Sequence, residues 1–230
     1  MRRAALAALA LAAAAPAYAG SEGVYLTLDG GYSLFNKDKL SSKLAKYVSP
    51  SDVDLLVNNQ MPDGGFFALH LGYNIAGHVA IEGSFALHPW QPFDDTRGGI
   101  GITGLAVRWF PLQGLIRPNR QFDFSLLAGI NYMLMGGGGL KDPGSGKQVA
   151  NSGRGFDGIA AEFGTTLELY PVKTISIGLT PRLYLLDPAR YFTSFNDRDK
   201  GGSAALGGGN GGNMFSIALS VTFHFEPIPD

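Results

Sequence analysis

The fold is decided by the last regular stretch of the chain, 215-FSIALSVTFHF-225. Its odd-numbered residues are all large and apolar, and its even-numbered residues are small or polar. This period of two is that of a β-strand, whose side chains point alternately to opposite faces. The pattern predicts a strand with one face in an apolar environment and the other face in a polar one.

The same alternation recurs along the chain, each time bounded by glycine, proline or polar loops. It predicts eight strands, over Val24–Phe35, Phe66–Ala76, His78–His88, Gly99–Phe110, Phe122–Leu134, Gly158–Tyr170, Ile175–Leu185 and Phe215–Phe225. The fourth strand is the least regular, because Ile100 and Ile102 fall on its polar face. This irregularity predicts a β-bulge near Gly101 or Gly104.

Strand lengths and loop lengths together favour a membrane barrel. A tilted strand needs about 9–11 residues to cross a bilayer, and the predicted strands are slightly longer than that. Short connections follow the second and sixth strands, a moderate one follows the fourth, and long ones follow the other strands. Short periplasmic turns with long outer loops are the layout of an outer-membrane barrel. No run of 18 or more apolar residues predicts a membrane-spanning helix.

The composition fits an exported protein that is stabilised without disulfide bonds. The chain has 230 residues, no cysteine and 16% charged residues, whereas soluble domains carry about 25%. Arg2, Arg3, the apolar run Ala4–Ala15 and the motif 17-AYA-19 predict a cleaved Sec signal peptide at residues 1–19. Residues 20–230 are then expected to form one barrel with a short periplasmic tail. The mature chain would be slightly acidic, with no basic excess to indicate nucleic acid as a partner.

From about Gly23 to Phe225 the chain resembles the small eight-stranded outer-membrane barrels of the OmpA/OmpX type. The fold implied is all-β, an eight-stranded antiparallel up-and-down transmembrane β-barrel without a peptidoglycan-binding domain. The stretch Phe215–Phe225 is similar to the C-terminal signal of that class, which implies recognition by the barrel-assembly machinery. Glu226–Asp230 follow the final aromatic residue, where members of the class often stop. The resemblance implies a monomer in the cell outer membrane, in contact with lipid and lipopolysaccharide.

Closure of such a barrel requires the last strand to pair with the first, because lipid cannot satisfy an open edge. The large apolar residues then face lipid and the small or polar residues face the lumen. Aromatic girdles lie near strand ends in this class of barrel. The residues expected in the girdles are Tyr25, Tyr32, Tyr73, Trp109, Phe110, Tyr132 and Phe223.

A set of charged residues falls on the lumen face and is the candidate site. Its members are Asp29, Glu82, Arg108, Asp123, Glu162, Glu168 and Arg182. Pairing Tyr170 with Thr174 would place Glu162 directly opposite Arg182, which predicts an ion pair between them with Asp29 or Glu168 nearby. Such a network can hold a closed barrel together, or it can gate a narrow water-filled passage; the sequence leaves both open.

No catalytic residue, cofactor or metal site is predicted. His88 with Asp94 and Asp95 has a passing likeness to an outer-rim protease, but both acids share one loop. His224 and Ser220, which could suggest a lipid-modifying enzyme, point inward on one strand. The loop 196-NDRDKGG-202 has only partial calcium-loop spacing.

The first long loop is different, because Leu40, Leu44, Tyr47 and Val48 recur at helical spacing. We expect a short amphipathic helix that caps the mouth of the barrel or touches lipopolysaccharide. Lysines along this stretch could meet anionic sugar phosphates; they are Lys37, Lys39, Lys43 and Lys46.

The function expected is non-enzymatic: membrane integrity, or surface interaction through the extracellular loops. The alternative is a narrow gated channel for small solutes, and a third possibility is an outer-rim protease or lipid-modifying enzyme.

Overall fold

The computed structural model describes residues 23–47, 53, 63–75, 78–90, 97–112, 122–138, 154–172, 174–192, 203–207 and 211–225. Its elements are, in chain order, β1 (Gly23–Asn36), α2 (Lys37–Leu44), β2 (Gly64–Ile75), β3 (Val79–Trp90), β4 (Arg97–Trp109), β5 (Phe122–Gly138), β6 (Arg154–Val172), β7 (Ile175–Phe192), β8 (Ser203–Ala205) and β9 (Gly212–Phe225). The predicted signal peptide at 1–19, the tail at 226–230 and the loop at 196–202 lie outside the described residues.

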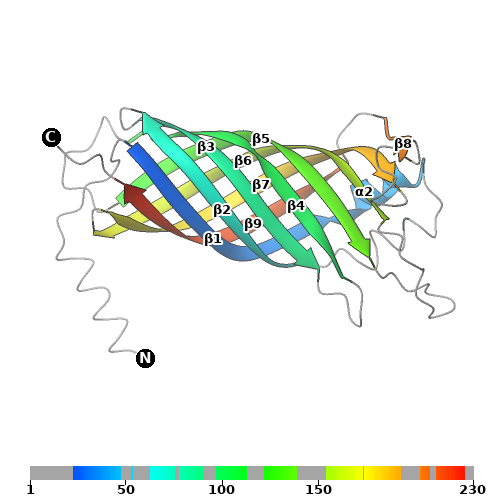
Figure 1. Ribbon diagram of the computed structural model, residues 1–230, viewed down its shortest axis with the longest axis horizontal. Helices are drawn as coiled ribbons and strands as arrows, with labels where there is room; N and C mark the ends of the chain where they lie inside the picture. Colours follow the sequence, from blue (N-terminus) through cyan, green and yellow to red (C-terminus); the bar gives the residue numbers. More distant parts are fainter. Residues whose placement is uncertain are drawn as a thin grey trace, which may run out of the picture.

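The eight long strands of the described chain, β1 to β7 and β9, form a closed antiparallel barrel (Figure 1). Each strand pairs with its neighbours, and β9 pairs with β1 from Val24↔Phe225 to Asn36↔Asn213. The predicted pairing of the last long strand with the first is therefore confirmed. A closed ring leaves no edge of unpaired N–H and C=O groups, which is the condition for a sheet that crosses a bilayer.

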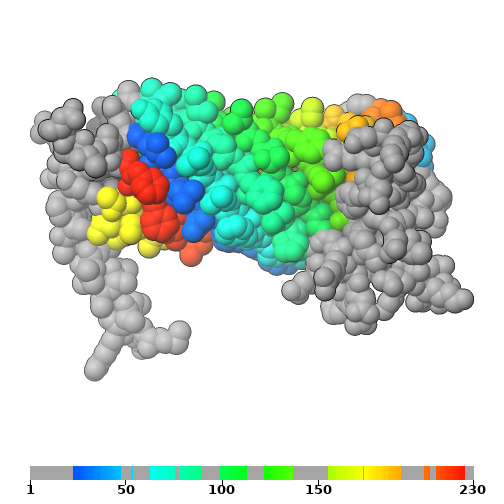
Figure 2. Space-filling model, viewed as in Figure 1, coloured from blue at the N-terminus to red at the C-terminus, as the bar shows by residue number. Residues whose placement is uncertain are grey.

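Side chains alternate between the two faces of the wall as the sequence predicts. On β9, Leu219 is 62% exposed, whereas the adjacent Ser220 is 1% exposed. The other long strands also point large apolar side chains outward. These side chains form a continuous cylindrical wall (Figure 2). The outer surface of the barrel is thus suited to acyl chains, and the interior is suited to polar groups.

Strand β4 does not contain the predicted bulge. Its register with β3 and with β5 runs without a shift along its length. Ile100 and Ile102 stay on the lumen face and are each 1% exposed. The prediction of a bulge near Gly101 or Gly104 was wrong because this part of the lumen is itself apolar.

Two of the predicted girdle residues point into the lumen. Tyr25 and Phe110 are each 4% exposed and pack in a small inner cluster with Ala80. Both lie on the lumen side of the strand alternation, and that position decides where an aromatic residue points. The residues that do face outward are Tyr32, Tyr73, Trp109, Tyr132 and the half-buried Phe223.

The two ends of the barrel differ. The first residues of β1 and the last of β9 lie at one end, which also has the close connections between β2 and β3 and between β6 and β7; we call it the turn end. The other end, here called the loop end, carries α2 and β8 (Figure 1). Strands β5, β6 and β7 extend past their predicted limits toward the loop end. The helix expected in the first long loop is present as α2, with Leu40 and Leu44 buried. No helix among the described residues is long and apolar enough to cross a membrane.

Candidate functional site

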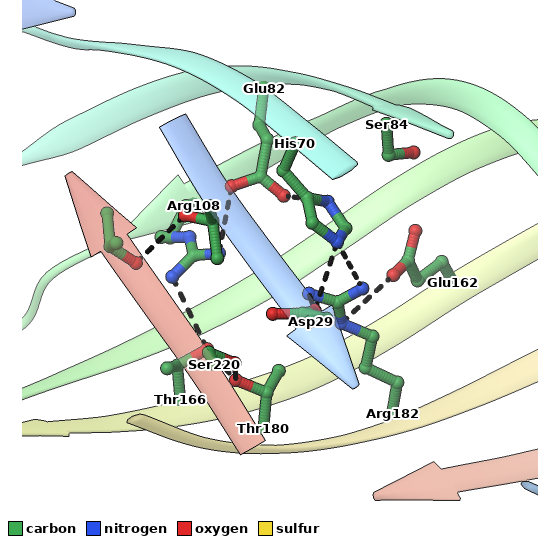
Figure 3. A network of polar contacts seen from close by, with 12 residues as sticks. Asp29, His70, Glu82, Ser84, Arg108, Glu162, Thr166, Thr180, Arg182 and Ser220 are labelled. Atoms are coloured by element: carbon green, nitrogen blue, oxygen red, sulfur yellow. Dashed lines mark hydrogen bonds and ion pairs between the residues drawn. The ribbon is translucent and has the colours of Figure 1, made fainter. Parts of the chain in front are cut away.

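All seven charged residues predicted to face the lumen do so. They come from six strands, β1, β3, β4, β5, β6 and β7, and none is more than 4% exposed. Ion pairs inside the barrel link Asp29, Glu82, Arg108, Glu162, Glu168 and Arg182, and Figure 3 labels all of these except Glu168. Burying so many charges is costly unless each is paired and hydrogen-bonded.

Arg182 of β7 organises the first half of the network. Its Nη2 atom lies 2.7 Å from Oδ2 of Asp29, and its Nε atom lies 3.5 Å from Oε1 of Glu162. Its Nη1 atom lies 2.9 Å from Nε2 of His70. The predicted ion pair between Arg182 and Glu162, with Asp29 nearby, is therefore present, although Asp29 is the closer partner.

The register that suggested this pair is different. Glu162 lies opposite Tyr184, and Arg182 lies opposite Gly164. The shift arises at the turn, where the ladder is irregular between Leu169 and Val172. Arg182 is long enough to reach Glu162 diagonally, so the contact forms despite the change of register.

Arg108 of β4 organises the second half. Its Nη2 atom lies 2.8 Å from Oε2 of Glu82, and its Nη1 atom lies 3.5 Å from Oε1 of Glu168. The guanidinium group also lies 5.9 Å from the centre of the Tyr25 ring, a cation–π distance. Asp123 is directly opposite Glu168 in the sheet, and its Oδ1 atom accepts a hydrogen bond from the backbone N–H of Phe124.

His70 of β2 joins the two halves, although it was not among the residues predicted for the site. Its Nδ1 atom lies 2.9 Å from Oε1 of Glu82, and its Nε2 atom lies 3.0 Å from Oδ2 of Asp29. The imidazole ring thus lies between the two arginines (Figure 3). With both ring nitrogens protonated it donates to both carboxylates, whereas a neutral ring can accept from Arg182 through Nε2. The signal that could have found it is its place on the lumen face of β2, beside β1 and β3.

One lumen glycine shows why small residues accompany these charges. A Cβ atom on Gly72 would collide with the ring of Tyr25. The hydroxyl of Tyr25 donates to Oε2 of Glu82 at 2.9 Å. The missing side chain at Gly72 therefore makes room for an aromatic ring that supports the network.

Neutral groups donate further hydrogen bonds to two of the carboxylates, Glu162 and Glu168. Asn131 donates to Oε2 of Glu162 at 2.9 Å, and the hydroxyl of Tyr184 donates to its Oε1 at 3.1 Å. The hydroxyl of Tyr170 donates to Oε2 of Glu168 at 2.9 Å. Thr180 links the hydroxyls of Thr166 and Ser220. The network thus ties strands all around the lumen to one another.

The part of the lumen nearer the loop end is apolar. Its buried cluster includes Leu40 and Leu44 of α2 together with side chains from the barrel wall, among them Phe66, Ile100, Ile102, Met133, Met135, Phe156 and Met214. Lys43 on α2 forms an ion pair with Asp187 at 2.5 Å and donates to the carbonyl of Pro188 at 3.0 Å, which fastens the helix to β7. We call this apolar cluster and helix α2 together the plug.

The histidines that raised the question of catalysis have other partners. His88 is 4% exposed inside the barrel, where its Nδ1 atom lies 3.0 Å from Oγ of Ser33 and its ring stacks on Phe66. The Nε2 atom of His224 lies 3.2 Å from Oγ of Ser176. Asp94 and Asp95 lie outside the described residues. In the described part of the chain, no group of three or more His, Asp or Glu side chains is arranged to hold a metal ion.

Comparison with known proteins gives a consistent result. Residues 4–223 match the family described as "Outer membrane protein beta-barrel domain". Neisserial surface protein A has a solved structure with a TM-score of 0.55 and 10% identity, which covers 90% of this chain and 99% of that one. This likeness shows a shared fold.

Two further solved structures have lower TM-scores. The outer membrane protein OprG of Pseudomonas aeruginosa has a TM-score of 0.48 and 14% identity, over 90% of this chain and 100% of that one. The attachment invasion locus protein Ail of Yersinia pestis has a TM-score of 0.47 and 13% identity, over 89% and 99%. No curated protein sequence matches the chain.

Proposed function

Because the chain belongs to the outer-membrane β-barrel domain family and lies in the outer membrane, we propose that it is a closed, non-enzymatic barrel. In this proposal the wall contributes to membrane integrity, and the loop end is an attachment surface at the cell exterior. Outer-membrane barrels place their long loops outside the cell, so the loop end is the extracellular one.

The plug is the observation that carries the proposal. Leu40 and Leu44 are 1% and 0% exposed, and the wall residues around them are buried to the same degree. An apolar cluster packed across the lumen offers no polar groups to replace the hydration shell of an ion. The charged network below it favours the same conclusion, because its side chains fill an interior that in an eight-stranded barrel is just wide enough for them.

Single-channel recording in planar bilayers tests the closed lumen. The refolded wild-type protein should give no discrete unit conductance. A Leu40→Asn/Leu44→Asn variant, which removes the apolar contacts of α2, should give small openings. The control is Lys39→Asn/Lys46→Asn, because both lysines are on the exposed side of the same segment. A reproducible unit conductance from the wild type would contradict the proposal.

The runner-up is a narrow channel for small solutes, and one observation favours it. The turn-end half of the lumen is lined by charged and hydroxyl groups, and Arg182 holds Glu162 at the long distance of 3.5 Å. If the plug moved aside, the lumen beneath it would form a polar passage. In that case the wild type itself would conduct, and Glu162→Ala would change the unit conductance.

The membrane-integrity role has a separate test in cells. A strain without the protein should be more sensitive to detergent, and the wild-type gene should restore resistance. The Leu40→Asn/Leu44→Asn variant should restore resistance less well, because an opened lumen admits small toxic molecules. If the strain that lacks the protein is as resistant to detergent as the wild type, the protein does not contribute to membrane integrity.

A further inference from the structure

The outer wall of the barrel has two adjoining hollows on the side formed by β1, β9, β7 and β6. The upper hollow, at the loop end, has a volume of about 530 Å³ and is bordered by Asn36, Lys37 and Asn213. The lower hollow has a volume of about 470 Å³ and is bordered by Thr165 and Pro181. Both are lined by Leu183 and Phe215, which lie directly opposite each other on β7 and β9. The two hollows therefore meet at this pair of residues, and we call them together the groove.

The lower hollow exists because small side chains interrupt a wall of large ones. Thr165 and Pro181 face outward at matching positions of β6 and β7, between rows of leucine and phenylalanine. Proline has no N–H to give to the ladder. The pairing of β6 with β7 is present at Gly164↔Arg182 and again at Leu167↔Leu179, but not between them. The groove thus ends in a dent at mid-wall.

The upper end of the groove is polar and partly basic. Lys37 and Asp38 open helix α2 and lie on its rim with two asparagines, Asn36 and Asn213. Over Lys37–Tyr47 the chain carries four lysines and one acid, and Lys43 is paired with Asp187 of β7. The other three lysines still exceed the one acid, so this edge has a net positive charge. Below the rim the outward-facing residues are apolar. The groove therefore runs from a basic rim to an apolar dent.

We propose that this groove binds a single phosphorylated glycolipid of the outer leaflet. The rim meets a headgroup phosphate through Lys37, and an acyl chain lies over Leu183 and Phe215 with its end in the dent at Pro181. From Asn213 to Ile217, which is opposite Pro181, the strand rises about 13 Å at about 3.3 Å per residue. That length suits a lipid tail. The rim lies at the extracellular end, where the headgroups of this leaflet lie.

The inference is independent of a closed or open lumen, because every surface it uses faces lipid. Charge and position select the lipid. An anionic headgroup would balance the excess of lysine at this edge, which a neutral headgroup would not. A lipid of the inner leaflet would have its headgroup at the turn end. A phosphorylated lipid of the outer leaflet satisfies both ends of the groove.

Lipid retention by the full refolded chain tests the proposal. The barrel is placed in phosphatidylcholine nanodiscs that contain a small fraction of lipid A, and the lipid that stays bound is counted by native mass spectrometry. Lys37→Glu should weaken retention about fivefold or more, because that factor corresponds to the contribution of one lysine to binding at an anionic surface. Leu183→Trp, which fills the place where the hollows meet, should weaken it by a similar factor.

Two matched variants and two lipids separate this site from general attraction. Lys46→Glu makes the same charge change on the same segment away from the rim, and Leu105→Trp adds the same bulk on β4. Both should retain lipid A as the wild type does. Dephosphorylated lipid A and phosphatidylglycerol should be retained no better than phosphatidylcholine. Loss of retention in Lys46→Glu, equal retention of phosphatidylglycerol, or no preference for lipid A in the wild type would each overturn the proposal. The heat-modified gel mobility of each variant verifies that it is folded.

Discussion

Replacing Arg182 by methionine should destabilise the barrel strongly, because the arginine is fully buried among acids. Its guanidinium group lies 2.7 Å from Asp29, 2.9 Å from His70 and 3.5 Å from Glu162. Methionine keeps most of the length of the side chain and removes the charge. Breaking a buried ion pair by deleting one partner costs about 3–5 kcal/mol, since the other charge remains without compensation. We expect Arg182→Met to lower the free energy of unfolding by that amount.

A second substitution shows that the loss comes from the stranded carboxylate. Asp29→Asn removes the negative charge that Arg182→Met leaves behind. The double variant should therefore be more stable than the sum of the two single losses implies, by about 0.5–3 kcal/mol, the range for side chains in contact.

The assay is reversible urea unfolding in lipid vesicles, followed by tryptophan fluorescence and by gel mobility. Arg190→Met is the matched control. Arg190 is on the same strand and bonds Asp157 through two nitrogens at 3.0 and 2.8 Å, but its side chain is 44% exposed. Asp157 is buried, but the guanidinium group of Arg190 reaches solvent, and the hydroxyl of Tyr132 also donates to Asp157 at 2.8 Å. Arg190→Met should therefore cost clearly less than Arg182→Met, and equal losses at positions 182 and 190 would refute the reasoning.

Three further outcomes are expected. Leu219→Arg on the lipid face should cost about 2–4 kcal/mol, whereas Phe225→Arg on the same face at the end of the strand should cost about 0–1 kcal/mol; equal penalties in urea unfolding would mean that Leu219 does not lie near the bilayer midplane. Gly31→Ala should destabilise the barrel by about 1–3 kcal/mol, because its Cβ would collide with the carbonyl of Ile217 and lie 2.7 Å from the Cα of Ala218. Gly30→Ala is its control, since nothing lies within 4 Å of that Cβ, and a loss of stability there would count against the argument. His70→Phe should cost about 1–3 kcal/mol, because Asp29 and Glu82 each lose one buried hydrogen bond while they keep their arginine partners. The exposed His78→Phe should cost clearly less in the same assay.

Much of the architecture could be predicted from the sequence, because lipid imposes one simple rule on every strand. A residue that faces lipid, such as Leu219, must be apolar, whereas its lumen-facing neighbour Ser220 need not be. The alternation of apolar and polar residues is therefore visible in each of the long strands. Closure follows from the same rule. The seven lumen charges could also be predicted, since charge on the lumen face stands out against small residues.

The interior itself was harder to predict. The expected alternation assumes a polar lumen, and it failed at Ile100 and Ile102, where the plug makes the lumen apolar. The girdle prediction for Tyr25 failed because it used the position near a strand end and not the alternation; the ring fits inside because Gly72 opposite it has no side chain. The register of β6 and β7 depended on the geometry of one irregular turn, which residue types do not specify.

The order of the strands has a consequence for how the molecule is made. The seam between β1 and β9 joins the first and the last strand of the described barrel, which lie far apart in the sequence. Until β9 is synthesised, β1 and β7 each have an edge of unpaired backbone groups that water can hydrate and hydrocarbon cannot. Contacts this distant along the chain form late and slowly. The strands therefore cannot insert one at a time: the chain must be kept unfolded until β9 is available, and a barrel that lacks one strand has no stable place in the membrane.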